Sequence, residues 1–307
     1  MRRAEAAAWL SCHDQFFIVT HCKPDGDTVG SAAALCMGLR QMGKTAWVIA
    51  DPDCPEKYTY LLDGLTKQTA AATDTVISVD VAAAHMLADP VYESRLQLRI
   101  DHHGSATPFG ENELIDSKAA ACGEIVYDLL TLLDVKLDIP MANALYTAVS
   151  TDTGCFRYAN TTEHSYMVAA ACKAVSPDLT DITRELFDTV TLGRLKLQSW
   201  LVEHMELLKN GTVAICAIPL CLKEQLNLSE ADFENISGFP RSIAGVKIAA
   251  TLREEEEGLI KLSVRTVPGY DAAAVCEKFG GGGHKGAAGA ALHMRLAEAV
   301  ETVKAVL

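Results

Sequence analysis

Four short apolar segments in the first third of the chain constrain its fold more than any other feature. They cover residues 16–20, 45–50, 75–79 and 96–100, and each runs directly into acidic or histidine side chains. Helix-favouring stretches such as residues 28–42 lie between them, so the pattern predicts βαβ units and a parallel sheet with helices on both faces. The carboxyl ends of parallel strands share one sheet edge, where open α/β folds bind their ligands.

The side chains that follow these strands have the chemistry of metal ligands. The candidates are His21, Asp25 and Asp27 after the first segment, Asp80 after the third, Asp101, His102 and His103 after the fourth, and Asp152 after a later helix. Four or more carboxylates in one cleft would repel one another and raise their pKa values, a conflict that divalent ions resolve. Mixed imidazole and carboxylate ligands favour Mn²⁺, with Mg²⁺, Fe²⁺ or Co²⁺ as other candidates.

Each of these residues alone has an ordinary structural explanation. An aspartate after a strand often caps a helix, a Pro-Asp-Gly-Asp stretch is a common turn, and a lone histidine often belongs to the core. Proline turn chemistry explains Asp51 and Asp53 after the second segment. The ordered set across several elements is what favours a two-metal centre, in which one aspartate could bridge ions about 3.5–4 Å apart. The triplet Asp101-His102-His103 ends where Gly104 and Ser105 release the chain.

Length, composition and charge exclude several classes of protein. The chain has 307 residues and a formal net charge of −13, which argues against binding long duplex nucleic acid through a basic surface. Bound metal ions could still reverse the local charge for short phosphorylated molecules. No apolar run is long enough to span a bilayer, and no signal peptide is evident, so a cytoplasmic protein is expected. The ten scattered cysteines form no Cys-x-x-Cys pair and favour reduced thiols.

The character of the sequence changes at Asn210-Gly211, which predicts a domain boundary. We expect a catalytic domain over residues 1–185, a helical connector over 186–209, and a smaller α/β domain over 210–307 across a cleft. Apolar residues on the connector could serve a homodimer. In the last domain, residues 246–252 and 259–265 predict a hairpin with an acidic loop between them.

A glycine run in the second domain is the candidate for substrate binding. Residues 280–283 are all glycine, and so flexible a run is not expected to serve packing. Backbone N–H groups of Gly281, Gly282 and Gly283 could converge on an anion, with His284 as a further donor. Arg265, at the end of a strand, could bind a phosphate in bidentate fashion, and Arg241 is a weaker candidate. The structural alternatives are a plain loop and surface arginines.

The ordered motifs resemble the DHH phosphoesterases that carry a DHHA1 second domain. The resemblance rests on residues 21–31, Val79-Asp80, Asp101-His102-His103, residues 151–154 with Asn160-Thr161, and residues 280–289. It covers nearly the whole chain. The two-domain layout and residues 239–242 and 263–265 look most like the compact nano-RNase and pAp phosphatase group.

The resemblance implies an activity and a division of roles. It implies Mn²⁺-dependent hydrolysis of short oligoribonucleotides and removal of the 3′-phosphate from 3′-phosphoadenosine 5′-phosphate. His21, Asp25 and Asp80 would hold one ion, and Asp27, Asp80, His102 and Asp152 the other. His103 would contact the scissile phosphate, and Asp101 would orient the imidazoles. Arg265, Arg241, Ser242 and the glycine run would bind the rest of the substrate.

Other functions remain open at this point. A phosphodiesterase for cyclic dinucleotides or their linear products would use the same catalytic half. An inorganic pyrophosphatase would share the first domain, but the glycine-rich segment around His284 belongs to the other type of second domain. A non-catalytic nucleotide-binding protein would be expected to have lost a ligand, and none is missing.

Overall fold

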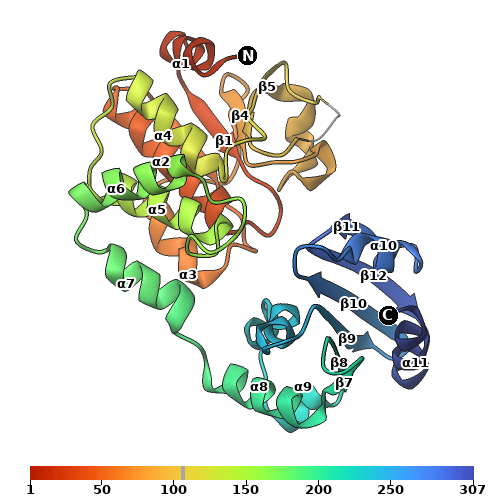
Figure 1. Cartoon of the computed structure of the whole chain (residues 1–307). Coiled ribbons are helices and arrows are strands. Elements are labelled where there is room, and N and C mark those ends of the chain that lie inside the picture. Colours follow the sequence, from red (N-terminus) through yellow and green to blue (C-terminus); the bar gives the residue numbers. More distant parts are fainter. Residues whose placement is uncertain (105–107) are drawn as a thin grey trace. The chain divides into compact units, whose positions relative to one another are not determined.

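A computed structural model describes residues 1–104 and 108–307 of the chain, so Ser105 lies outside the described residues. The chain divides into two compact units, Met1–Thr189 and Val190–Leu307 (Figure 1). Among the described helices, none combines the length and apolar character needed to cross a membrane.

The first unit is built on a six-stranded sheet in the order β3-β2-β1-β4-β5-β6. The strands are β1 (Phe16–Val19), β2 (Ala46–Ile49), β3 (Thr66–Lys67), β4 (Thr75–Val79), β5 (Leu96–Asp101) and β6 (Asn112–Ile115). Every neighbouring pair is parallel, which confirms the predicted parallel sheet. The short edge strands β3 and β6 were not expected from the sequence.

The helices of the first unit gather on one face of this sheet (Figure 1). They are α1 (Arg3–Cys12), α2 (Gly26–Gln41), α3 (Glu56–Thr59), α4 (Cys122–Leu132), α5 (Ile139–Asp152), α6 (Glu163–Val175) and α7 (Leu179–Thr183), with a π-helical turn at Arg184–Asp188 and a 3₁₀ turn, η1, at Tyr60–Leu62. Helices α2 and α5 approach closely because Gly30 has no side chain. A Cβ atom there would lie 2.3 Å from the carbonyl oxygen of Ala144.

Shorter elements cover the other face of the first sheet. Phe17 and Val19 of β1 pack there with Val81, Leu87 and Tyr92. These partners lie in or beside two 3₁₀ helices, η2 (Ala84–Met86) and η3 (Pro90–Arg95). Strand β1 is therefore buried on both sides, as its wholly apolar sequence predicts.

The second unit contains a separate six-stranded sheet in the order β11-β12-β10-β9-β8-β7. Its strands are β7 (Glu206–Leu208), β8 (Val213–Ile218), β9 (Ile248–Glu256), β10 (Leu259–Thr266), β11 (Gly282–His284) and β12 (Ala287–His293). Strands β8 and β9 are parallel, and the other neighbouring pairs are antiparallel. The predicted hairpin is present as β9 and β10, but the acidic residues expected in its loop continue β9 as far as Glu256.

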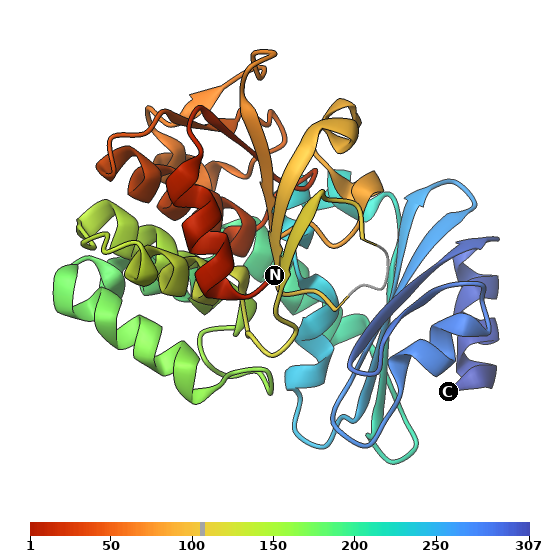
Figure 2. The ribbon, with the colours of Figure 1, turned by 90° about the horizontal axis from the view of Figure 1, so that it is seen from above.

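Helices cover both faces of this second sheet. They are α8 (Leu192–His204), α9 (Leu222–Gln225), α10 (Ala272–Glu277) and α11 (Leu296–Val306), with 3₁₀ helices η5 (Glu230–Phe233) and η6 (Ile236–Ser242). Helices α10 and α11 pack on one face (Figure 2). On the other, Leu197 and Leu201 of α8 pack with Cys216 and Ile218 of β8. The expected connector, residues 186–209, thus includes a helix that packs within the second unit.

Candidate metal centre

The loop after β1 supplies three candidate ligands and also starts α2. Asp25 is the N-cap of α2, and its Oδ1 accepts a hydrogen bond from the Thr28 backbone N–H at 3.0 Å. Asp27 lies in the first turn of the helix and is fully buried. His21 precedes the turn, and its Nδ1 lies 2.9 Å from the carbonyl oxygen of Cys22. This contact favours protonation at Nδ1 and leaves Nε2 to bind a metal.

Asp80 follows β4 in a left-handed backbone conformation, with φ of +56°. Aspartate tolerates this conformation better than most residues, and it turns the chain sharply at the strand end. Oδ2 of Asp80 accepts a hydrogen bond of 2.6 Å from the hydroxyl of Thr28. Oδ1 is buried and accepts no hydrogen bond from any described residue. A buried carboxylate oxygen in this state is suited to coordinating a cation.

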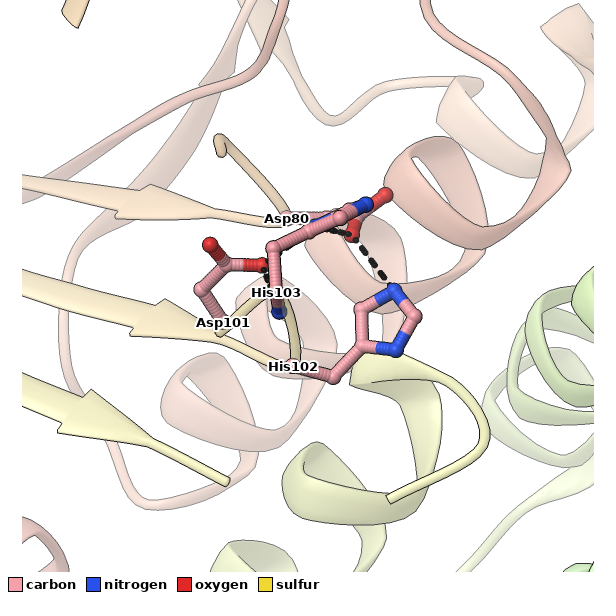
Figure 3. A group of neighbouring side chains, drawn as sticks. All are labelled: Asp80, Asp101, His102 and His103. Carbon is pink, nitrogen blue, oxygen red and sulfur yellow. Dashed lines mark hydrogen bonds and ion pairs between the residues drawn. The ribbon is translucent and has the colours of Figure 1, made fainter. Parts of the chain in front are cut away.

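The end of β5 carries the Asp101-His102-His103 triplet beside Asp80 (Figure 3). Asp101 accepts hydrogen bonds from Nδ1 of His103 at 2.8 Å and from Nη2 of Arg99 at 2.5 Å. Arg99 is itself fully buried and donates to the carbonyl oxygens of Val81 and Ala82 just after Asp80. Asp101 therefore holds His103, while Arg99 ties the ends of β4 and β5 together.

Two helices complete the centre. Asp152 is the last residue of α5. The amino end of α4 faces Asp27, whose carboxylate accepts the backbone N–H groups of Cys122 at 2.6 Å and Gly123 at 2.9 Å. The hydroxyl of Ser31 donates to the same carboxylate at 2.9 Å. The first N–H groups of α4, which have no partner within the helix, and the positive end of its dipole thus stabilise a buried acid from another element.

The ligand atoms fall into overlapping groups. Nε2 of His21 lies 4.0 Å from carboxylate oxygens of both Asp25 and Asp80. Nε2 of His102 lies 3.4 Å from Oδ1 of Asp80, 3.4 Å from Oδ2 of Asp152 and 3.8 Å from Oδ2 of Asp27. Asp80 is common to both surroundings, so the structure brings together all six residues predicted as metal ligands.

Burial and mutual repulsion dominate the electrostatics of these acids. Burial raises the pKa of Asp27 well above its ordinary range, and the neighbouring carboxylates raise it further. Burial and then the charges of Asp80 and Asp25 raise the pKa of Asp152 to about 7. The pKa of Asp80 is also raised, first by burial. In the absence of a cation, the raised pKa values favour the neutral form of each acid, which is the conflict that the sequence predicted.

In the Asp101–His103 pair, by contrast, the pKa shifts favour the charged form of both side chains. The hydrogen bond to Asp101 raises the pKa of His103 to about 8, against the opposing effect of burial. Burial alone would raise the pKa of Asp101, but hydrogen bonds from His103 and Arg99 hold it below its ordinary value. The pair is therefore an ionic one, beside the metal ligands.

The donor set fits divalent ions. Two groups of side chains, His21 with Asp25 and Asp80, and Asp27 with His102 and Asp152, each bring one ligand atom per residue within 4.8 Å of the others. Nδ1 of His102 faces the carbonyl oxygen of Ala119 at 3.3 Å, which leaves Nε2 as its ligand atom. Imidazole nitrogen with carboxylate oxygen suits Mn²⁺, Mg²⁺, Fe²⁺ or Co²⁺.

The predicted substrate-binding residues lie on one face of the second sheet. Arg265 pairs across the sheet with Ala287, which pairs in turn with His284, so these three side chains point to the same side. His284 and Gly282 are exposed, and Arg265 is partly buried. Arg241 and Ser242 lie in η6, where Nη1 of Arg241 reaches the carbonyl oxygen of Thr266 at 3.5 Å.

The expectation that the glycine run serves no packing role is wrong for two of its members. A Cβ atom at Gly281 would lie 2.1 Å from the carbonyl oxygen of Gly289, and one at Gly283 would lie 2.6 Å from that of Ala287. The backbone at Gly283 in β11, and at Gly281 just before it, therefore lies too close to β12 for a side chain at either position. Gly282 has open space around it.

Two residues of the centre were missed as site residues in the sequence. Thr28 supplies the hydroxyl for Asp80, and Arg99 supplies the buried charge for Asp101. A charged residue two positions before Asp101 in the predicted strand was the available signal for Arg99. Nothing in the local sequence of Thr28 distinguishes it from an ordinary helix residue.

Family models match both units of the chain. The DHH family, N-terminal domain, matches residues 15–149, and the DHHA1 domain matches residues 210–307. A parallel sheet with this acid and imidazole cluster at its carboxyl edge is, in that context, the catalytic half of a phosphoesterase.

Individual relatives match nearly the whole chain. A Thermus thermophilus protein named bifunctional oligoribonuclease and PAP phosphatase NrnA is 34% identical, covering 90% of this chain and 83% of the relative. A Streptococcus mutans protein named probable bifunctional oligoribonuclease and PAP phosphatase NrnA is 28% identical over 92% and 91%. The crystal structure of an exopolyphosphatase-related protein from Bacteroides fragilis shares the fold, with a TM-score of 0.86, 24% identity and coverage of 99% and 95%. The chain belongs to the DHH family of metal-dependent phosphoesterases, and it is similar to relatives named NrnA over most of its length.

Proposed function

We propose that this chain hydrolyses oligoribonucleotides a few residues long and removes the 3′-phosphate of 3′-phosphoadenosine 5′-phosphate. The observation that carries the proposal is the convergence of His21, Asp25, Asp27, Asp80, His102 and Asp152 at one sheet edge. The Thermus thermophilus relative, matched over 90% of this chain, is named for both activities. The net charge of −13 supports small substrates over long duplexes.

Two divalent ions, with Mn²⁺ as the first choice, would be held by two sets of ligands. His21, Asp25 and Asp80 would hold one ion, and Asp27, Asp80, His102 and Asp152 the other. When bound, such a pair supplies a water nucleophile of lowered pKa and offsets the charge of the phosphate.

His103 would contact the scissile phosphate. Its side chain is 44% exposed, and its Nδ1 is engaged by Asp101, so Nε2 is the nitrogen left to donate to a phosphate oxygen. Asp101 would act as the orienting partner, since its carboxylate accepts hydrogen bonds from the backbone N–H and from Nδ1 of His103 and so fixes the ring. A preorganised donor of this kind stabilises charge that develops on phosphate oxygens.

The second unit would bind the rest of the substrate. Arg265 and His284 offer cationic and hydrogen-bonding groups on one face of its sheet, and Gly282 leaves backbone accessible beside them. Arg241 and Ser242 would contribute from η6. A site that grips a terminal phosphate gives long strands no advantage over short ones, and the net charge of −13 disfavours an extended basic groove for a longer strand.

The test is a substrate panel with the full chain and Mn²⁺. It contains 3′-phosphoadenosine 5′-phosphate, labelled RNAs of two to five nucleotides, linear and cyclic dinucleotides, and pyrophosphate. We expect release of mononucleotides from the RNAs and of phosphate from 3′-phosphoadenosine 5′-phosphate, abolished by a chelator and by Asp80→Ala. Hydrolysis of pyrophosphate alone, or of cyclic dinucleotides alone, would overturn the proposal.

A further inference from the structure

A short segment that supplies no ligand atom contacts the ligands of one metal group. The segment, residues 119–123, leads into the first turn of α4. The carbonyl oxygen of Ala119 faces Nδ1 of His102, and the N–H groups of Cys122 and Gly123 bind the carboxylate of Asp27. Two of the three ligands in the group Asp27, His102 and Asp152 are thus held from the same short stretch of backbone.

The third ligand is joined to this segment through Asn160. The amide nitrogen Nδ2 of Asn160 donates to the carbonyl oxygen of Ala120 and to that of Asp152, both at 3.1 Å. The carbonyl oxygens in the last turn of a helix have no partner within the helix, and Asp152 ends α5. Asn160 therefore caps α5 and fastens that cap to the segment that holds the other two ligands.

Asp152 needs such a tie because its own position is electrostatically unfavourable. It is an acid at the carboxyl end of a helix, where the helix dipole is negative, and its carboxylate lies beside other buried acids. Its side chain is 29% exposed, so it has room to turn toward water. Among the described residues, the hydrogen bonds of residues 119–123 do not extend to His21 or Asp25 of the other group.

We propose that Asn160 is a positioning residue for Asp152, and that it sets the affinity of the Asp27–His102–Asp152 group for a divalent ion. The inference rests on the proposed function only in taking this group as a metal site. Loss of the amide would free the end of α5 and let Asp152 leave the group. Residues that orient metal ligands typically change metal affinity about 10–100-fold when they are replaced.

Metal binding itself is the readout. Equilibrium dialysis of the full chain against Mn²⁺, with metal analysis, should give two ions per wild-type chain. Asn160→Ala should weaken binding of one ion by about tenfold or more. The nearly isosteric Asn160→Asp, which lacks the N–H donor, should do the same. Wild-type Mn²⁺ affinity in either variant would overturn the proposal.

The chain offers a matched control on the same helix. Asn143 also holds α5 by two hydrogen bonds, to Asp178 at 3.2 Å and from Ser176 at 2.6 Å. It lies about 13 Å from Asp152 along the helix axis, from the rise of 1.5 Å per residue. Asn143→Ala should leave both Mn²⁺ affinities unchanged. An equal loss in this variant would show that general loosening of α5 is responsible and would overturn the specific role of Asn160.

A double variant tests whether Asn160 acts through Asp152. If it does, Asn160→Ala with Asp152→Ala should bind Mn²⁺ no more weakly than Asp152→Ala alone. A further tenfold loss in the double variant would overturn the proposed route. Normal Mn²⁺ binding without hydrolysis of any RNA would overturn the proposed function and leave this inference standing, whereas a wild-type chain that binds no Mn²⁺ would overturn both.

Discussion

The two sheets of this molecule carry their candidate functional residues in different places. In the first unit these residues follow the ends of β1, β4 and β5, at the carboxyl edge of a parallel sheet. In the second unit Arg265 and His284 project from the face of the sheet, two strands apart. A position at a strand end is fixed by where that strand stops. A position on a face depends on the pairing of strands that are distant in sequence.

The two regions also differ in how strongly function is tied to folding. Asp27, Asp80, Arg99 and Asp101 are buried, and the side chains of the first three are hydrogen-bonded to other elements. Exposed His284 and partly buried Arg265 lie on the sheet face opposite α10 and α11. Substitutions in the first unit should therefore affect chemistry and stability together, and those in the second should affect mainly substrate affinity.

The largest expected effect is that of Asp80→Ala. Because Asp80 belongs to both ligand surroundings, its loss should lower kcat on the order of 10⁴-fold or more, with KM little changed. Steady-state kinetics on a labelled RNA dinucleotide measures this. Asp51→Asn is the control, since Asp51 also follows a strand of this sheet but joins no ligand group. A kcat within tenfold of wild type for Asp80→Ala would contradict the shared-ligand assignment.

Arg99→Met should be the most destabilising of these changes. It leaves buried Asp101 with His103 but without the guanidinium group, and removing one partner of a buried ion pair typically costs about 3–5 kcal/mol. In the second unit, Lys223→Met removes an exposed ion pair with Glu230, worth about 0–1 kcal/mol. Urea unfolding of both variants beside wild type compares the two regions directly. Equal stability of the two variants would show that Arg99 is not a structural tie between β4 and β5.

The sequence predicts the site of the first unit better than that of the second, because residues at strand ends can be located from the strand pattern alone. His21, Asp25, Asp80 and the triplet at 101–103 were found because each follows an apolar strand. Thr28 was missed as a site residue because its partner Asp80 lies on another element, which no local pattern reveals. The short edge strands β3 and β6 were missed because they lack the apolar pattern of the central strands.

The glycine run shows what remained hidden in the second region. Composition predicts flexibility at Gly281 and Gly283, whereas in the structure Gly283 pairs with β12 and a Cβ atom at either glycine would collide with β12. Only the antiparallel pairing of β11 with β12 reveals that a side chain would collide there. The pairings of β12 with β11 and with β10 place Ala287 between His284 and Arg265, an arrangement that spacing along the chain does not show.

Removing metal should give the two units opposite responses to pH. In a chelator, Asp27, Asp80 and Asp152 hold protons more tightly in the folded chain than in the unfolded chain. The free energy of unfolding of the first unit should therefore fall as pH rises from about 4 to about 7, the value to which the pKa of Asp152 is raised. Saturating Mn²⁺ should restore the free energy of unfolding of the first unit above pH 7.

Asp232 should give the second unit the opposite dependence of stability on pH. Burial alone would raise its pKa, but hydrogen bonds from Thr191 and Ser229 lower it overall. Its contribution to stability is present above the unfolded pKa of about 4 and is lost as pH falls below that value. Thermal unfolding between pH 3 and pH 8, with and without Mn²⁺, tests both signs. Metal-free stability of the first unit that rises from pH 4 to pH 7 would contradict the repulsion among its acids.

The smallest effect should come from Arg265→Ala, and it should be confined to substrate binding. We expect KM for an RNA dinucleotide to rise about tenfold, the effect of losing about 1.4 kcal/mol of binding, while kcat and Mn²⁺ affinity stay unchanged. Lys261→Ala is the control, because Lys261 lies on the same strand and face and is exposed. A fall in kcat without a change in KM would show that Arg265 acts in the chemical step. It would contradict the view that the second unit serves only substrate binding. An equal rise in KM for both variants would show that general positive charge on this face, rather than the arginine opposite Ala287, attracts the substrate.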